Sequence, residues 1–318
     1  MALSGETRRA LYLLAAPLGV LVTLVCAGCG GTSNPIEYHS ISERASSDNT
    51  NTVFAAFAGT GQLFVYRIAN SGGSSTLLTQ VSNDGNPNND GGTHPFFSPD
   101  GSKVVFVSDD DGNQDIFTMG RDGGSRTQLT TDPGSDRQPS FTPDGTQIVF
   151  ASNRTGNYDI WIMDDDGANQ RQLTNSSDDE EWPSVGPVSK LAWQLDDNAA
   201  GDTDIYTADI PGAGLAINVT NVTPAGTFNE GAPSWDPTGT GAVTDTILFH
   251  SDEAGTYDIW KMDADGSNHA QLVTTPASEG FPVWFPNGQR FVFTMAREAW
   301  HAASDGTDKK RITTRFPS

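Results

Sequence analysis

The chain has little cysteine, few basic residues and no apolar run long enough to cross a bilayer. Its 318 residues include two cysteines, Cys26 and Cys29, so no disulfide is expected within the domain that follows them. Lysine and arginine number 18 against 40 aspartates and glutamates, for a net charge of −22. This acidity argues against nucleic acid and against an anionic membrane surface as partners. It favours solubility and a basic or cationic partner.

The N-terminal apolar run, Ala10–Val25, has the length of a signal-peptide core and follows two arginines. It ends shortly before Ala-Gly-Cys, and this arrangement resembles a bacterial lipoprotein signal with lipid attached at Cys29. We therefore predict a signal peptide at residues 1–28 and a tether rich in Ser, Asn and Gly at residues 29–51. The protein is expected to be exported and lipid-anchored, in the periplasm or on the outer surface. The general secretory and twin-arginine routes both remain open.

Most of the remaining sequence is repetitive. Residues 98–130 and 142–174 match at 16 of 33 positions without a gap. Each copy alternates short apolar runs, such as Val104–Val107, with turn signals of the Pro-Asp-Gly and Asp-Gly type. This pattern predicts four short antiparallel strands per copy.

Weaker copies follow, and each is led by a proline: Pro95, Pro139, Pro183, Pro233 and Pro282. With one divergent unit at the start, residues 52–318 predict an all-β fold, a six-bladed β-propeller of four-stranded antiparallel blades. Stacking the units around an axis buries faces that one unit cannot bury alone. The first unit lacks its inner strand, for which Ile36–Ile41 is the candidate, and ring closure is expected to mix strands from both ends of the chain. An open stack of sheets is the alternative.

The repeat at 139–174, "PSFTPDGTQIVFASNRTGNYDIWIMDDDGANQRQLT", resembles the WD-like propeller repeat of TolB and its relatives. The resemblance covers the propeller alone, because the tether is too short for the extra α/β domain that precedes the propeller in TolB. It implies a binding role, since the TolB propeller binds a partner lipoprotein over its channel mouth.

Four carboxylates stand at one repeated position, three residues before a blade proline: Asp136, Glu180, Glu230 and Glu279. The loop that carries them is expected to pass the channel mouth. A propeller would arrange them in an acidic arc there, and together with His94 they are our candidate binding residues for a basic protein segment or a cation. The alternative is that these loops are ordinary solvated surface.

No catalytic or metal-binding motif stands out. The calcium-like run from Asp109 lacks the glycine and glutamate of an EF-hand, the five histidines share no ligand spacing, and a nucleophile elbow is absent. The repeated aspartates, such as Asp115, are interpreted as structural acceptors of local N–H groups. We therefore predict a monomeric, non-enzymatic binding module without cofactor or metal. A polysaccharide lyase or hydrolase is the alternative, and it requires His94 and His250 to lie together beside a basic residue.

Overall fold

The computed structural model divides into two compact units, Met1–Asn34 and Pro35–Ser318, and all of the described residues lie in the second. The structure describes residues 37–40, 51–57, 63–69, 76–78, 93–109, 112–197, 202–223, 228–296 and 298–312. The predicted signal peptide and Cys29 lie outside these residues.

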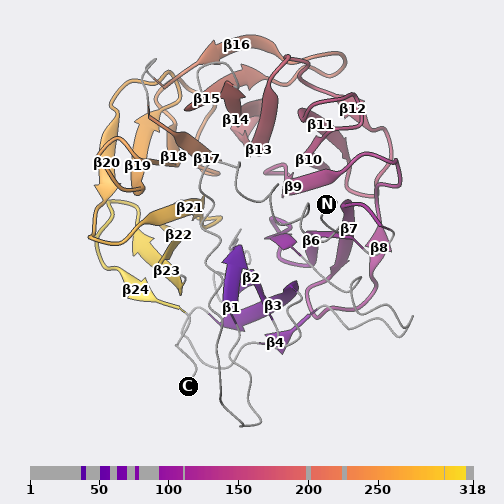
Figure 1. Ribbon diagram of the computed structural model, residues 1–318, viewed down its shortest axis with the longest axis horizontal. Helices are drawn as coiled ribbons and strands as arrows, with labels where there is room; N and C mark the ends of the chain where they lie inside the picture. The colour runs from indigo at the N-terminus through magenta and orange to yellow at the C-terminus, as the bar shows by residue number, and fades with distance from the viewer. Residues whose placement is uncertain are drawn as a thin grey trace, which may run out of the picture. The chain divides into compact units, whose positions relative to one another are not determined.

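Six four-stranded antiparallel sheets follow one another along the chain, each made of four consecutive strands (Figure 1). The first three sheets are β1 (Glu37–Ser40), β2 (Asn51–Phe57), β3 (Leu63–Ala69), β4 (Thr76–Leu77); β5 (Thr93–Phe97), β6 (Lys103–Ser108), β7 (Asp115–Gly120), β8 (Thr127–Gln128); and β9 (Asp136–Phe141), β10 (Gln147–Ser152), β11 (Asp159–Asp164), β12 (Arg171–Gln172).

The other three sheets are β13 (Asp179–Gly186), β14 (Lys190–Asp197), β15 (Asp202–Asp209), β16 (Ile217–Asn221); β17 (Glu230–Trp235), β18 (Thr246–Ser251), β19 (Asp258–Asp263), β20 (Ala270–Val273); and β21 (Glu279–Trp284), β22 (Arg290–Met295), β23 (Glu298–Ala303), β24 (Lys310–Arg311). The first strand of each sheet from β5 onward contacts the first strand of the next, so these inner strands lie nearest the axis. A single 3-10 turn, η2 (Pro187–Ser189), is the helical element that the described residues contain. None of their helices is long and apolar enough to cross a membrane.

The predicted six-bladed propeller needs correction. Five sheets, β5–β8 through β21–β24, have the predicted repeat, with the blade proline in the inner strand and a packed core. Residues 37–78 form a paired sheet, but they lack the blade proline and the Pro-Asp-Gly turn, and Val53 and Leu78 are its only described side chains. The structure therefore shows five blades of the repeated type rather than six, beside a first sheet of different sequence.

The ends of the chain differ in part from the prediction. Strand β1 lies within the predicted segment Ile36–Ile41 and pairs antiparallel with β2, with Glu37 opposite Phe57. This confirms that it is the inner strand of the first sheet. No sheet among the described residues mixes strands from the two ends, so that prediction is wrong, because β1 already occupies the position that a C-terminal strand would have supplied.

Apolar cores form between neighbouring blades. One cluster combines Val105, Ile116 and Leu129 from the β5–β8 blade with Phe141 and Phe150 from the β9–β12 blade. All five side chains are at most 7% exposed. Each sheet has two apolar faces that are covered only when blades stack, as the repeat predicts. Burial of this kind is the main favourable contribution to folding.

Tight turns hold the strands of each blade in register. Between β5 and β6, Gly101 has φ +70°, its N–H bonds to the carbonyl of Ser98, and the Asp100 carboxylate accepts the N–H of Ser102. Only glycine adopts this left-handed conformation without strain, which explains the Pro-Asp-Gly signal.

Every inner strand of the five blades contains a bulge directly before its proline. The residue there has a positive φ in all five: His94 (50°), Gln138 (55°), Trp182 (53°), Ala232 (47°) and Phe281 (52°). The pairing with the second strand shifts register at the same point. A non-glycine residue in this region is strained by about 1–3 kcal/mol, and such strain is concentrated at functional sites. We call these five positions the bulge residues.

Candidate functional site

The predicted acidic arc is internal. Asp136, Glu180, Glu230 and Glu279 are each the first or second residue of an inner strand, and their exposed fractions are 0%, 3%, 3% and 1%. The prediction that these carboxylates line an open mouth is wrong, because each side chain turns into the protein and meets hydrogen-bond donors there. A buried carboxylate requires such donors, since burial alone costs several kcal/mol.

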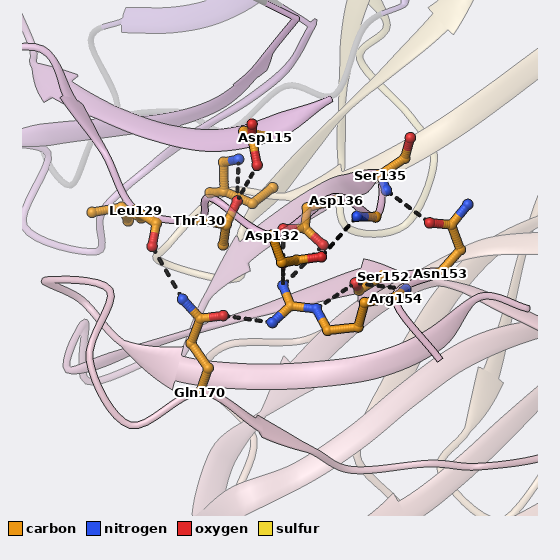
Figure 2. Close-up of polar contacts among 12 residues, drawn as sticks. Asp115, Leu129, Thr130, Asp132, Ser135, Asp136, Ser152, Asn153, Arg154 and Gln170 are labelled. Carbon is orange, nitrogen blue, oxygen red and sulfur yellow. Dashed lines mark hydrogen bonds and ion pairs between the residues drawn. The ribbon is translucent and has the colours of Figure 1, made fainter. Parts of the chain in front are cut away.

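Arg154 holds the first of these carboxylates (Figure 2). Its Nη2 atom donates to Asp136 Oδ1 and Oδ2 at 3.0 and 2.9 Å and lies 2.5 Å from Asp132 Oδ2. The remaining nitrogens of the guanidinium donate to Ser152 Oγ and Gln170 Oε1, at 2.8 and 2.7 Å. The guanidinium also lies over the Trp161 ring, 4.5 Å from its centroid. These contacts tie Arg154 to the other strands of its own blade and to Asp132 in the loop that leads into that blade.

Asp115, the first residue of β7, is another buried carboxylate held by hydrogen bonds within its blade. Asp115 accepts the hydroxyl of Thr130 at 3.1 Å, and Thr130 Oγ1 in turn accepts the N–H of Ile116 at 2.9 Å (Figure 2). The side chain of Gln128 donates to the other Asp115 oxygen. Asp115 is therefore structural, as interpreted from the sequence, although its recorded donors are side chains of the outer strand rather than backbone N–H groups. Burial raises its pKa to about 6.

The next two carboxylates have no guanidinium bonded to them. Glu180 accepts the indole N–H of Trp193 at 3.0 Å, and burial raises its pKa to about 7. Glu230 accepts the hydroxyl of Ser251 at 3.3 Å, and its pKa rises to about 8. Burial is the main cause for Glu230, followed by repulsion from Asp204. Both groups are thus protonated in part near neutral pH.

Glu279 forms a carboxyl pair with Asp258. Both are 1% exposed, and Glu279 Oε2 and Asp258 Oδ1 have no hydrogen-bond partner among the described residues. The hydroxyl of Thr275 donates to Glu279 Oε1. Burial and the neighbouring Asp258 raise the pKa of Glu279 to about 7. A proton on one carboxyl would supply the missing donor between the two, as in other paired carboxylates.

The bulge residues surround a pocket on the axis. The space at this pocket is about 500 Å³ when the open solvent at its mouth is counted. All five bulge residues line it, together with the blade prolines Pro139, Pro183, Pro233 and Pro282. Each bulge lies directly before a blade proline, and five side chains from five blades line this one pocket. His94, the fifth of our predicted binding residues, is one of them.

Aromatic rings fill much of this pocket. The Trp182 ring lies 5.2 Å from His94 and 4.9 Å from Phe281 between centroids, and Phe281 lies 5.2 Å from His250. The His250 ring also contacts Tyr257 edge to face. Aromatic faces of this kind give large contact area at low entropic cost, which suits binding surfaces.

The charged groups beside the pocket neutralise each other. Arg137 forms an ion pair with Glu181, and its guanidinium lies 3.5 Å from the centroid of Tyr158. Gln138 links the same carboxylate to the pocket, because its Nε2 donates to Glu181 Oε2 at 3.1 Å and its Oε1 accepts the N–H of Trp182 at 3.0 Å. The pocket therefore offers an apolar, electrically balanced surface in a strongly acidic chain.

The two histidines are neutral and have different partners. Burial lowers the pKa of both His94 and His250 to about 4, and Arg137 lowers that of His94 further. The rings of Trp182 and Phe281 lie between them in the chain of ring contacts. The described residues contain no group of three His, Cys, Asp or Glu side chains able to hold a metal ion.

Sequence reasoning found one bulge residue and missed four. The blade prolines mark the inner strands in the sequence, but nothing in the sequence singles out the residue before each of them. These four residues, Gln138, Trp182, Ala232 and Phe281, differ in chemistry, so no residue-type pattern connects them. Their common signal is the position before the repeated proline, where a helical backbone is disfavoured.

Comparisons with known proteins agree on the fold. The family described as TolB beta propeller domain matches residues 37–191. A comparison of the sequence with curated proteins finds no match. Among solved structures, TolB from Acinetobacter baumannii is 21% identical with a TM-score of 0.56, and the alignment covers 73% of this chain and 55% of that chain. This chain thus spans little more than half the length of that TolB.

Two enzymes also share the architecture. A puromycin-hydrolyzing peptidase of Mycobacterium tuberculosis is 16% identical with a TM-score of 0.59, over 87% of this chain and 46% of that chain. An oligogalacturonate lyase of Vibrio parahaemolyticus is 12% identical with a TM-score of 0.58, over 89% and 80% of the two chains. Identities this low establish the fold alone, because one fold hosts many functions. Residues 37–191 therefore match the TolB beta propeller domain family, and the described chain has a propeller fold.

Proposed function

We propose that this protein is an exported, non-enzymatic binding module that captures a segment of a partner protein at the pocket lined by the bulge residues. The observation that carries the proposal is the convergence of five strained backbone positions, from five blades, on one aromatic-lined pocket. The positive φ of each bulge residue strains the backbone, and strain retained at a cleft is typical of sites that act on a ligand. Export and lipid attachment at Cys29 remain part of the proposal.

The partner segment is apolar rather than basic. A basic partner was expected because four carboxylates were placed on an open rim, and these carboxylates are buried. The pocket combines the rings of Trp182 and Phe281 with the neutral imidazole of His94. An uncharged apolar or aromatic side chain fits such a pocket, while a lysine or arginine would lose hydration without gaining a free anion.

The test is affinity capture from an envelope fraction by the full chain and by two variants. Trp182→Ala/Phe281→Ala removes the two largest rings of the pocket and should reduce capture of the partner at least tenfold, as for hot-spot aromatics. Phe228→Ala is the matched control, because Phe228 is 38% exposed and does not line the pocket. Equal capture by the double variant and the control would show that the partner binds elsewhere.

A further inference from the structure

The outer edge of the β13–β16 sheet differs from every other outer edge. Strand β16 is last in its sheet and pairs only with β15. It has five residues, all of them exposed, while the outer strands β4, β8, β12 and β24 have two residues each and β20 has four. One long backbone edge in the described part of the chain therefore faces solvent.

This edge lacks the charges that normally protect a sheet edge. Residues 212–223 contain no charged residue and no proline, in a chain with a net charge of −22. The difference can be seen at the residue directly after a positive-φ residue, which precedes the outer strand in the other four blades and lies within β16 here, as Asn218. In the other four blades this residue is polar or basic, and in this blade it is Val219; the four others are Arg126, Gln170, His269 and Lys309.

Exposed apolar side chains are concentrated on the same segment. Leu215, Ile217 and Val219 are 42%, 53% and 53% exposed, and they are three of the six large apolar residues that are exposed among those described. Uncharged strands rich in β-branched residues are templates for pairing with another strand, and proteins that do not use such an edge shorten or charge it.

We propose that β16 pairs antiparallel with β16 of a second copy of this chain, giving a symmetric dimer joined through a continuous sheet. The net charge of the chain indicates which partner strand fits this edge. Two copies that each carry −22 repel one another over most surfaces, whereas this pairing places one uncharged segment against another. The dimer replaces the monomer expected from the sequence.

The carboxylates nearest to the edge are already occupied within their own sheet. Asp209 pairs with Lys190 and accepts the side-chain amide of Asn218 at 2.6 Å. Asp204 accepts the side-chain amide of Asn221 at 2.9 Å. Both asparagines of β16 thus turn toward β15 and cover these charges, which leaves the outer side of the strand neutral for a partner strand.

The test is the solution mass of the full chain by sedimentation, over roughly a hundredfold range of concentration, because dimerisation follows mass action. We expect a mass of two chains at the upper end. Ile217→Lys/Val219→Lys should be monomeric throughout, since the new charges face each other across the twofold axis. Both side chains are half exposed, so the variant should keep the thermal unfolding midpoint of the wild type.

The matched control is Val188→Lys/Val243→Lys, which adds the same charge at two apolar side chains that are 71% and 64% exposed. It should remain dimeric. Hydrogen exchange provides a second readout, since the amides of β16 should exchange more slowly as the concentration rises. A monomeric wild type, equal dissociation of both variants, or a dimer in which β16 gains no protection would each overturn the proposal.

Discussion

The guanidinium of Arg154 lies against a carboxylate that has no exposed surface, with Nη2 at 3.0 and 2.9 Å from the two oxygens of Asp136. The equivalent carboxylates in the next two blades have different hydrogen-bond donors. Glu180 is held by the indole of Trp193, and Glu230 by the hydroxyl of Ser251. Burial therefore raises the pKa at this repeated position in all three blades, and Arg154 opposes the rise at Asp136.

Replacing Arg154 by methionine should destabilise the fold strongly. Asp136 and Asp132 would lose their shared cation, and removing one partner of a buried ion pair costs about 3–5 kcal/mol. Urea denaturation monitored by circular dichroism would measure the loss of unfolding free energy.

The matched variant is Arg154→Met/Asp136→Asn, which removes the cation together with the buried charge that most requires it. We expect the double variant to recover at least half of the lost stability, because an amide is less costly to bury than an unpaired carboxylate. A double variant as unstable as the single one would mean that lost packing over Trp161 is the main effect.

The fold should be more stable in mild acid than in mild base. Burial raises the pKa of Glu180 and Glu279 to about 7 and that of Glu230 to about 8, from an ordinary value of 4.5. Between these values the folded state binds more protons than the unfolded state, so the unfolding free energy falls as pH rises. The thermal midpoint should therefore drop between pH 5 and pH 8.5.

Glu230→Gln separates this effect from the general repulsion of an acidic chain. Glutamine resembles the protonated carboxyl, so the variant should be more stable than the wild type at pH 8.5, by about 1–3 kcal/mol, and nearly equal to it at pH 5. A neutralising change at an exposed carboxylate of another blade, Asp166→Asn, alters the net charge equally and should not flatten the pH profile. Parallel profiles for Glu230→Gln and the wild type would contradict the burial of a protonated Glu230.

The backbone strain at the bulges can be measured at Ala232, whose φ is +47°. Ala232→Gly removes only a methyl group and allows this φ without strain, so it should raise the unfolding free energy by about 1 kcal/mol. The same change at Ala302, which is buried in β23 and has no positive φ, should lower it by a similar amount. Destabilisation by both changes would mean that the bulge is not strained.

Lipid anchoring is tested by Cys29→Ser. This change should release the protein from the membrane fraction or block its processing, because the serine hydroxyl does not replace the thiol that carries lipid. Cys26→Ser should fractionate like the wild type. Equal membrane association of the Cys29 variant and the wild type would exclude this anchor.

The repeat predicted the strands well because periodic turns and apolar runs act locally. Val104–Val107 and the Pro-Asp-Gly turns lie where the pattern placed them. The first sheet was harder to predict, because residues 37–78 contain neither the blade proline nor the Pro-Asp-Gly turn. The candidate site was predicted less well, since the sequence gives the position of Asp136 in the repeat but not the direction of its side chain. Burial of that carboxylate depends on Arg154, which lies on the following turn of the same blade.

The pocket escaped prediction for a related physical reason. His94, Trp182 and Phe281 come from different blades, and only the arrangement of the inner strands around the axis brings their rings together. Their shared feature is a backbone conformation, and a sequence shows residue types more readily than dihedral angles. The sequence feature that these five positions share is the proline that follows each of them.

The most direct test of the account is a photo-cross-linking measurement in intact cells, with a benzoyl-phenylalanine placed at position 281 in the pocket or at position 243 on an exposed loop. The account predicts a discrete adduct with one partner protein from position 281, its loss when Trp182→Ala is added, and no such adduct from position 243. An adduct from position 243 alone, or an adduct from position 281 that persists without the Trp182 ring, would contradict binding at the pocket lined by the bulge residues.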